Sequence, residues 1–514
     1  MDDAPAIESL VSRVLSRLRE SGALEAVQSK RPVRNSALRA DDRPIVRKYK
    51  PSGAAKAATV QAVPAPSASS TPTGEGVFAD PDAAVRAAHA SFEELTRLGF
   101  NARFKLVAAI RKAALENLER WSNEAVLETG MGRASDKIEK NRLVSERTPG
   151  PEYLLQPDTF CGSDGLTLNR YDPWGVAAAI APCTNSTETI INNGISLISA
   201  GNAVVFNAHP VASRVSADCV RTLNRAIAAA GGPGQLLCCV AEPTIESAGE
   251  LMRDPLVSLV IVTGGGAVVD AAMKSGKRAI CAGPGNPPAV VDETACLERA
   301  AHDIVRGAAL DNNVVCTDEK AVLAVTSIAD KLKALMLNQH CVEVPTRLVG
   351  KLTDLVLAEK GSAKSHGAAN KRYVGKNACV ILREIGMSVD DSVRLAIVDV
   401  EQDHPLLWTE QLMPVLPLCR VKDADAASAH AAAIEGGRRH TASIHTQRLD
   451  RATRFAAQLN CSICVVNASN VAGLGLGGEG YTSFSIATPT GEGLTTARTF
   501  SRVRRLSLCG ALSR

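Results

Sequence analysis

A cysteine in the second half of the chain stands where a reactive thiol would be well placed. A small-residue helix pattern runs into Asp311-Asn312-Asn313, two valines follow, and Cys316 comes shortly before an apolar run at 321–325 that is typical of a buried strand. A thiol between two rigid elements combines fixed geometry with access to a cleft, and nearby backbone N–H groups stabilise its thiolate. Free cysteine is also among the most buried residue types. Cys316 alone is therefore compatible with either a nucleophile or a structural cysteine.

A glycine-rich run is the second candidate for chemistry. Thr263, Gly264, Gly265 and Gly266 follow an apolar run at 256–262 and precede a helix pattern that extends to residue 274. Glycines between a strand and a helix let the backbone approach a pyrophosphate at the helix N-terminus. The run is not a G-x-G-x-x-G fingerprint, and a plain strand–helix turn gives the same pattern. Both interpretations stay open on this run alone.

The elements around the glycines alternate between strand and helix patterns. Strand-like runs fall at 175–181, 203–207, 236–240 and 256–262, and helix patterns lie between them at 188–200, 212–230 and 245–252. Such alternation predicts a parallel, doubly wound α/β sheet with ligands at the carboxyl ends of its strands. A further strand begins at 287–292, and a second α/β region that carries Cys316 continues to about residue 483. Two doubly wound α/β domains are therefore expected.

Helices and a small flap complete the predicted fold. Helix patterns cover 82–98 and 101–129, and a charged stretch continues to 147. Residues 159–171 read as a hairpin around Ser163-Asp164-Gly165. Residues 498–508 largely alternate basic and apolar residues, which favours a sheet-edge strand that pairs across subunits. We expect the hairpin and this strand to form an oligomerisation flap.

The first 78 residues have a different character. An amphipathic helix is predicted near the start, with Asp3 as its cap, Pro5 in its first turn and six apolar residues on one face: Ile7, Leu10, Val11, Val14, Leu15 and Leu18. Arg13 and Arg17 interrupt any secretory apolar core, and the early acidic residues argue against a transit peptide. The tract from about 28 to 76 is basic, then rich in Ala, Pro, Ser and Thr, and reads as a flexible linker. The helix pattern fits a partner's groove or docking on its own domain equally well.

Composition excludes several classes of function. The chain has 514 residues, a net charge of +4 and only 3% aromatic residues, so neither electrostatics nor stacking favours nucleic acid binding. No apolar run approaches the roughly 20 residues of a membrane span. The 14 cysteines are scattered, which suits a reducing cytosol. Cys461 and Cys464 have redox-motif spacing, but their apolar context favours two core thiols. No zinc-type ligand spacing is present, and we expect no metal.

Several motifs together resemble the aldehyde dehydrogenase superfamily. They occur in that superfamily's order as Ile-Ala-Pro-Cys-Thr-Asn at 180–185, Phe-Asn-Ala-His-Pro at 206–210, Thr-Gly-Gly-Gly at 263–266, Asn-Val-Val-Cys at 313–316 and Glu-Gln-Leu-Met-Pro-Val at 410–415. The runs at 477–484 and 488–493 are similar to one branch, the CoA-acylating propionaldehyde and acetaldehyde dehydrogenases of bacterial microcompartments. The resemblance covers about residue 80 to the C-terminus.

The resemblance implies a role for each motif. Cys316 would be the nucleophile, and Asn185 with the backbone N–H of Cys316 would form the oxyanion hole, where one donor is typically worth ~3–4 kcal/mol. The implied cofactor-binding residues are Pro182, Cys183, Thr184, Asn207, His209, Pro210, Thr263, Gly264, Gly265, Gly266 and Glu410, the last of these near the nicotinamide ribose. Asn207 and Pro210 stand where the superfamily often has Lys and Glu, so the usual carboxylate against a 2′-phosphate is missing. NAD is the expected cofactor and NADP the alternative.

One absence in the sequence favours CoA as the acyl acceptor. Hydrolytic members of the superfamily activate water with a Glu in a Glu-Leu-Gly-Gly run, whereas the matching stretch here, 282–288, reads Ala-Gly-Pro-Gly-Asn-Pro-Pro. Without a general base, hydrolysis of the acyl-enzyme should lose roughly 100- to 10,000-fold. The branch commonly has Pro after the oxyanion Asn, where this chain has Ser186, which puts the rigidity of that loop in question.

The sequence thus predicts an NAD-dependent enzyme that converts a short aldehyde, propionaldehyde or acetaldehyde, to acyl-CoA through a Cys316 thioester. The expected organisation is a targeting helix at 1–20, a linker at 21–78, a dinucleotide-binding domain at 79–286 with its flap at about 150–172, a catalytic domain at 287–483 and a C-terminal segment at 484–514. By resemblance, residues 1–20 are similar to an encapsulation peptide that docks on shell protein, so the expected location is a microcompartment lumen. We expect a homo-oligomer, a dimer or tetramer. The alternatives are a hydrolytic aldehyde dehydrogenase and a non-catalytic cargo protein.

Overall fold

The computed structural model describes residue 71 and residues 73–510. These residues lie in a compact unit that spans Ala68–Arg514. The predicted targeting helix at 1–20 and nearly all of the predicted linker at 21–78 lie outside the described residues, as does the end of the chain from 511 to 514.

The first lobe is built on a parallel sheet that has six strands among the described residues, in the order β1-β6-β5-β4-β7-β8. Its strands are β1 (Val77–Phe78), β4 (Val176–Ile180), β5 (Ala203–Asn207), β6 (Leu237–Val240), β7 (Val257–Thr263) and β8 (Arg278–Ala282). The helices between them are α7 (Ser186–Ala200), α8 (Ser213–Ala229), α9 (Ile245–Arg253) and α10 (Gly266–Met273). The runs are apolar throughout because both faces of such a sheet are covered. The chain order reverses at β4, with β5 on one side and β7 on the other.

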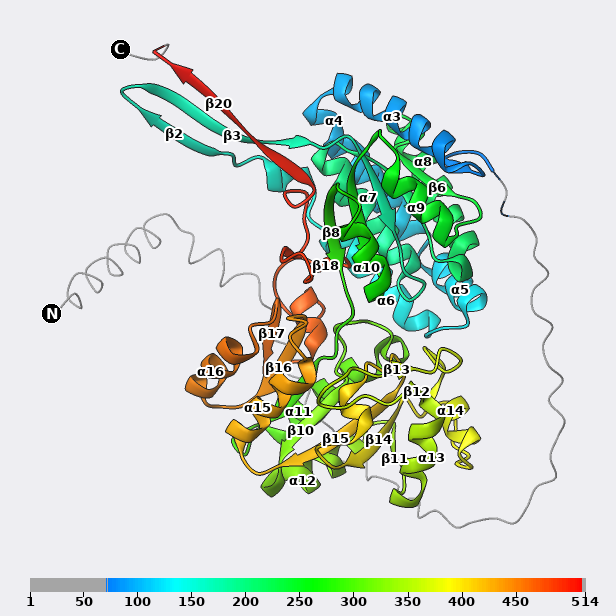
Figure 1. Cartoon of the computed structure of the whole chain (residues 1–514), viewed down its shortest axis with the longest axis vertical. Helices are drawn as coiled ribbons and strands as arrows, with labels where there is room; N and C mark the ends of the chain where they lie inside the picture. The colour runs from blue at the N-terminus through cyan, green and yellow to red at the C-terminus, as the bar shows by residue number, and fades with distance from the viewer. Residues whose placement is uncertain (1–70, 72, 511–514) are drawn as a thin grey trace, which may run out of the picture. The chain divides into compact units, whose positions relative to one another are not determined.

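The second lobe has a larger sheet of the same kind. In the part of the chain that the structure describes, its seven parallel strands run in the order β11-β14-β15-β10-β9-β16-β17. The strands are β9 (Pro288–Val291), β10 (Ala321–Val325), β11 (Cys341–Glu343), β14 (Leu395–Val400), β15 (Val415–Val421), β16 (Thr441–His445) and β17 (Ile463–Val466). The larger helices are α11 (Leu297–Ala309), α12 (Thr326–Leu337), α13 (Thr346–Val356), α14 (Ala378–Glu384), α15 (Ala424–Glu435) and α16 (Leu449–Leu459). The prediction of two doubly wound α/β domains is confirmed (Figure 1).

The functional motifs lie at the carboxyl ends of the strands in the first sheet and at the amino end of a strand in the second. In the first sheet the motif residues follow the carboxyl ends of β4, β5 and β7, as expected. Cys316 instead precedes β10, so it stands at the amino edge of the second sheet. The connection from β8 to β9, residues 283–287, leads from one edge to the other and contains the predicted domain boundary at 286/287. After β17 the chain returns to the first lobe, where Val471, Leu474 and Phe484 join the buried core around the first sheet.

The helices before the first sheet show one error in the sequence-based expectation. The pattern at 101–129 suggested one helix, but the structure has α4 (Phe100–Glu116) and α5 (Leu118–Thr129), which follow α3 (Pro81–Leu98) and precede α6 (Ala134–Arg147). The break is at Asn117, whose φ and ψ are −114° and 10°. Its side-chain amide donates to the carbonyl of Ala113 at 2.8 Å, and such local bonds compete with the helix ladder.

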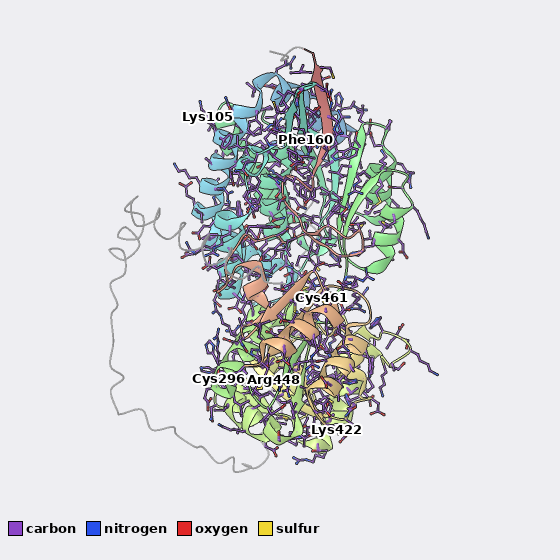
Figure 2. All side chains as sticks on the ribbon, turned by 90° about the vertical axis from the view of Figure 1, so that its left-hand side faces the viewer. Lys105, Phe160, Cys296, Lys422, Arg448 and Cys461 are labelled. Atoms are coloured by element: carbon purple, nitrogen blue, oxygen red, sulfur yellow. The ribbon has the colours of Figure 1, made fainter. Side chains whose placement is uncertain are left out.

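The flap is a three-stranded antiparallel sheet within the described residues, with the order β2-β3-β20. β2 (Asp158–Gly162) and β3 (Gly165–Pro173) form the predicted hairpin, and β20 (Ser501–Cys509) pairs with β3 along its whole length. One side of this last strand pairs with β3 of the same chain, and β20 lies at an edge of the sheet, as expected. Pairing of β20 across subunits through its other side stays a prediction. Phe160 and Val503, both on this flap, are 56% and 63% exposed. Figure 1 shows the three flap strands, and Figure 2 labels Phe160.

No helix among residues 73–510 is both long and apolar enough to cross a membrane.

Candidate active site

The loop before Cys316 has an unusual backbone. After α11 ends at Ala309, a short 3-10 turn, η3 (Leu310–Asn313), contains Asp311, Asn312 and Asn313 with φ angles of 46°, 56° and 63°. Three consecutive left-handed residues are costly for most side chains, and Asp and Asn tolerate this region best after glycine. The residues Asp-Asn-Asn therefore fit the loop that carries the thiol. Cys316 itself is partly exposed, while its neighbours Val315 and Thr317 are buried.

A buried lysine holds this loop from the strand side. The Lys320 ammonium donates to the backbone carbonyl of Asn313 at 2.7 Å, to its side-chain oxygen at 2.6 Å and to the carbonyl of Val315 at 2.9 Å. The three N–H groups of an ammonium are thus all used. The backbone N–H of Lys320 donates to the carbonyl of Pro287 at 2.9 Å, which joins the thiol loop to the connection between the two sheets.

The electrostatic surroundings keep the Cys316 thiol protonated at rest. Desolvation, followed by the Glu410 carboxylate, raises the pKa of Cys316 to about 12, and the Lys320 ammonium opposes both effects. Only a small fraction of the thiol is then ionised at neutral pH.

The side chain of Asn185, the predicted oxyanion-hole donor, is held by its oxygen rather than by its nitrogen. Asn185 occupies the N-cap position of α7, yet its side chain makes no capping bond. Its oxygen accepts from the Lys140 ammonium at 2.6 Å, and the one bond found for its Nδ2 within residues 73–510 is a 3.3 Å contact with the Thr184 hydroxyl. Ser186, in place of the branch's Pro, is the first residue of α7 and is buried.

Helix α6 connects the Asn185 loop to the Cys316 loop. The Lys137 ammonium donates to the carbonyl of Thr184 at 3.1 Å and to the Asp311 carboxylate at 2.8 Å, and Lys140 pairs with the same Asp311 oxygen at 2.6 Å. All three charged side chains are at most 2% exposed. Two loops that are more than 120 positions apart in the sequence therefore depend on one set of buried ion pairs.

The residues predicted to bind the dinucleotide lie at the carboxyl edge of the first sheet. Pro182, Cys183 and Thr184 are partly exposed after β4, and His209 and Pro210 are exposed after β5. Asn207 is buried: its amide donates to the carbonyl of Thr244 at 3.1 Å, and its oxygen accepts from the Ser247 hydroxyl at 2.7 Å. The Asn207 side chain therefore holds the start of α9.

The glycine run fits a pyrophosphate group. Thr263 is the last residue of β7, Gly265 is the N-cap of α10, and the helix begins at Gly266. A Cβ placed on Gly265 or Gly266 would meet no atom within 4 Å, and both residues are exposed. The open backbone at the start of this helix gives the unpaired N–H groups and the helix dipole that bind phosphate oxygens. On this observation, a nicotinamide dinucleotide fits the residues present.

Glu410 and Gly285 form a close arrangement beside the thiol. The backbone N–H of Gly285 donates to the Glu410 carboxylate at 3.4 Å. Burial raises the pKa of Glu410, and Lys320 and Arg438 oppose this shift. A Cβ on Gly285 would lie 2.7 Å from the carbonyl oxygen of Cys316 and 3.0 Å from the ring of His440. The 282–288 stretch has no carboxylate of its own, but Glu410 reaches it from another element.

His440 is a candidate that the sequence analysis missed. Its ring is buried, its Nδ1 lies 2.9 Å from the Thr441 hydroxyl, and its Nε2 has no hydrogen-bond partner in the described part of the chain. Burial, together with Lys320 and Arg438, lowers the pKa of His440 to about 3, so the imidazole is neutral and can accept a hydrogen bond. The Arg-Arg-His run at 438–440 gave no sign of this, because two arginines are typical of an exposed loop.

Across residues 73–510, no group of three or more His, Cys, Asp or Glu side chains is arranged to hold a metal ion.

The arrangement has the parts of a thiol-dependent aldehyde oxidation site: a held cysteine, an amide donor on a neighbouring loop and a phosphate-binding helix start. The model of the aldehyde dehydrogenase family matches residues 62–494. The chain belongs to the aldehyde dehydrogenase family.

The similar proteins fall in the CoA-acylating branch, which confirms the resemblance predicted from the motifs. The acetylating acetaldehyde dehydrogenase EutE of Salmonella typhimurium is 47% identical over 437 residues, which are 85% of this chain and 93% of EutE. A solved structure of Rhodopseudomonas palustris propionaldehyde dehydrogenase with bound CoA and an acylated cysteine is 43% identical, with a TM-score of 0.83 and coverage of 86% and 100%. A propionaldehyde dehydrogenase from the Clostridium phytofermentans fucose utilisation microcompartment is 42% identical, with a TM-score of 0.81 and coverage of 85% and 99%.

Proposed function

We propose that this aldehyde dehydrogenase oxidises a short-chain aldehyde with NAD and transfers the acyl group to CoA. The observation that carries the proposal is the convergence of the Cys316 loop and Asn185 on the same buried ion pairs of α6. The family relationship supports the dehydrogenase chemistry, and the relatives named above act on acetaldehyde or propionaldehyde. Propionaldehyde is our first choice of substrate and acetaldehyde our second.

The first half of the reaction forms a covalent bond to the chain. The Cys316 sulfur bonds to the aldehyde carbon, the thiol proton is released to solvent, and the C=O double bond opens so that the carbonyl oxygen becomes an alkoxide. Nδ2 of Asn185 and the backbone N–H of Cys316 donate to this oxygen, as an oxyanion hole does. Bound NAD supplies the hydride acceptor. Loss of hydride from the former aldehyde carbon leaves an acyl thioester on Cys316.

The second half releases the acyl group. The bond from the acyl carbon to the Cys316 sulfur breaks as the thioester to CoA forms, and the proton of the CoA thiol passes to the departing Cys316 sulfur, which regenerates the thiol. Nε2 of His440 is neutral and unpaired within the described residues, and it is our candidate for accepting a hydrogen bond from the CoA thiol during this transfer. The glycine run at 264–266 binds the dinucleotide pyrophosphate in this proposal. NADP is the alternative cofactor, because Asn207 and Pro210 stand in the matching run and leave no carboxylate there to exclude a 2′-phosphate.

The nature of the product tests this function. Purified protein incubated with NAD, propionaldehyde and CoA should give NADH and propionyl-CoA in equal amounts, measured by absorbance and by mass spectrometry of the small molecules. The second candidate is hydrolysis to the free acid, which the approach of Glu410 to Gly285 favours. Propionic acid as the main product in the presence of CoA would replace our proposal with this one, and absence of NADH would point to a non-catalytic cargo protein.

We also propose that the enzyme forms oligomers through the flap and is packaged in a bacterial microcompartment. The edge strand β20 and the exposed Phe160 and Val503 support subunit contact through the flap. The amphipathic pattern at 1–20 supports docking on shell protein, as does the microcompartment source of one relative.

Deletion of residues 1–20 is expected to leave the specific activity unchanged and to abolish co-purification with shells. A sharper version replaces Leu10 and Leu18 on the apolar face with Ser, with Ser12→Ala plus Ser16→Ala on the opposite face as the matched control. The first pair should remove shell association and the control pair should keep it. Equal shell association for both pairs, measured on purified shells, would contradict the targeting role.

A further inference from the structure

Lys140 is a buried cation that contacts the side chain of Asn185 in addition to forming ion pairs. Its side chain is 0% exposed and its ammonium lies 2.6 Å from the Asn185 oxygen, 2.6 Å from the Asp311 carboxylate and 3.1 Å from the Glu188 carboxylate. The Asn185 oxygen accepts a hydrogen bond from it, and the two carboxylates form ion pairs with it. Burial alone would lower the pKa of Lys140, but Asp311 and Glu188 raise it above its ordinary value, so the ammonium is charged.

The neighbouring Lys137 shows what a purely structural lysine does in this cluster. It pairs with the same Asp311 oxygen at 2.8 Å and holds the carbonyl of Thr184 at 3.1 Å. The link between the two loops would exist with Lys137 alone. What Lys140 adds is its contact with the side-chain amide of Asn185.

This contact fixes the orientation of the Asn185 side-chain amide, that is, the positions of its oxygen and of Nδ2. An ammonium has donors and no acceptor, so only the oxygen of the amide can face Lys140. Nδ2 must then point away from Lys140. A charged donor on the amide oxygen also draws electron density from the nitrogen, which makes Nδ2–H a stronger donor.

We infer that Lys140 is a positioning residue of the oxyanion hole, which fixes and polarises the Asn185 amide so that Nδ2 donates to the oxygen of the thiohemiacetal. The inference rests on the proposed function, because it acts through the alkoxide formed at Cys316. Lys140 touches neither the aldehyde nor the cofactor in this assignment. Its positioning effect passes through Asn185, whereas its ion pair with Asp311 holds the Cys316 loop, as that of Lys137 does.

A double-mutant cycle on the full-length protein tests this inference. The measured quantity is the rate of NADH formation in a single turnover with propionaldehyde and NAD, in the absence of CoA. The NAD affinity and the melting temperature of each variant are measured as controls. Asn185→Ala should slow this rate by roughly 100- to 1,000-fold. Lys140→Met should slow it by about 10- to 100-fold in the wild-type chain and by less than about 3-fold when Asn185 is already Ala.

Lys137→Met is the matched control, because it removes the same charge from the same cluster without touching Asn185. The fold-loss in rate of the Lys137→Met, Asn185→Ala double variant should equal the product of the losses of the two single variants. Lys140→Gln keeps a donor to the Asn185 oxygen without the charge and should give a rate between those of wild type and Lys140→Met. If Lys140→Met does not fold, the cycle is run with Lys140→Gln.

The inference is overturned if the fold-loss in rate of the Lys140→Met, Asn185→Ala double variant equals the product of the two single-variant losses, as is expected for the Lys137 control. Lys140 would then have only a structural role. Asn185→Ala with an unchanged rate would instead overturn the oxyanion assignment in the proposed function, and this inference with it. The two failures are thus distinguished by the single variant Asn185→Ala.

Discussion

Replacement of Cys316 by Ala is expected to abolish NADH formation from aldehyde, with a loss of roughly 10,000-fold or more, because the covalent intermediate can no longer form. The Cys316 thiol is partly exposed, and its backbone N–H and the lysine contacts of its loop do not depend on the sulfur. NAD binding and the melting temperature should therefore change little. The measurements are NADH absorbance, NAD titration by fluorescence and thermal unfolding.

Cys296→Ala is the matched control for this variant. Cys296 is exposed at the start of α11, on the same segment of chain as the nucleophile, and should be replaceable without loss of activity (Figure 2). Retained turnover in Cys316→Ala would contradict the assignment. The next thiol to test would be Cys183, which is partly exposed and packs against the same core cluster as Cys316.

Without CoA, the enzyme is expected to form one equivalent of NADH per active site and then to stall as the acyl-enzyme. Hydrolysis should be slower than acyl transfer by roughly 100- to 10,000-fold, because the 282–288 turn has no general base of its own. Stopped-flow absorbance gives the burst, and the acyl mass should appear on the peptide that contains residue 316.

The rate of this burst should rise with pH. The pKa of Cys316 is raised to about 12, so the thiolate is a minor species throughout the working range, and its fraction grows about tenfold per pH unit below that pKa. A burst rate that levels off near pH 7 would contradict the raised pKa.

Steady NADH production in the absence of CoA, with free acid as product, would contradict the expected stall. Glu410 would then be the base that activates water, since its carboxylate reaches Gly285 and acts on the Cys316 thiol. Glu410→Gln should in that case restore the stall. In our proposal, Glu410→Gln leaves the stall unchanged.

The sequence predicted most of what positions the site. The strands at 203–207 and 321–325 are found with the predicted bounds, because continuous apolar runs between turn residues leave little choice of element. The hairpin around Asp164 and the order of the motifs along the first sheet were equally readable. The helix break at Asn117 was missed, because one local side-chain bond decides it.

The buried polar groups could not have been predicted from the sequence. The sequence of helix α6 is typical of a charged, solvated helix, yet Lys137 and Lys140 are buried in it. The anion that they share, Asp311, comes from the other lobe, and Lys140 also pairs with Glu188 of α7. His440 and Glu410 likewise gain their surroundings from tertiary contacts near Gly285. Sequence periodicity indicates which face of an element is apolar. It carries no information on ion pairs between residues that are far apart in the sequence.

The crowding around the 283–285 turn limits how this catalyst could be redesigned. Grafting an acidic side chain at Gly285 would press on the Cys316 carbonyl and the His440 ring, and at Gly283 it would meet the ring of Pro489 at 2.8 Å. Either substitution would displace the loop that carries Cys316. A laboratory or evolutionary route from thioester synthesis to acid production would therefore have to rebuild the turn before it could install a new base.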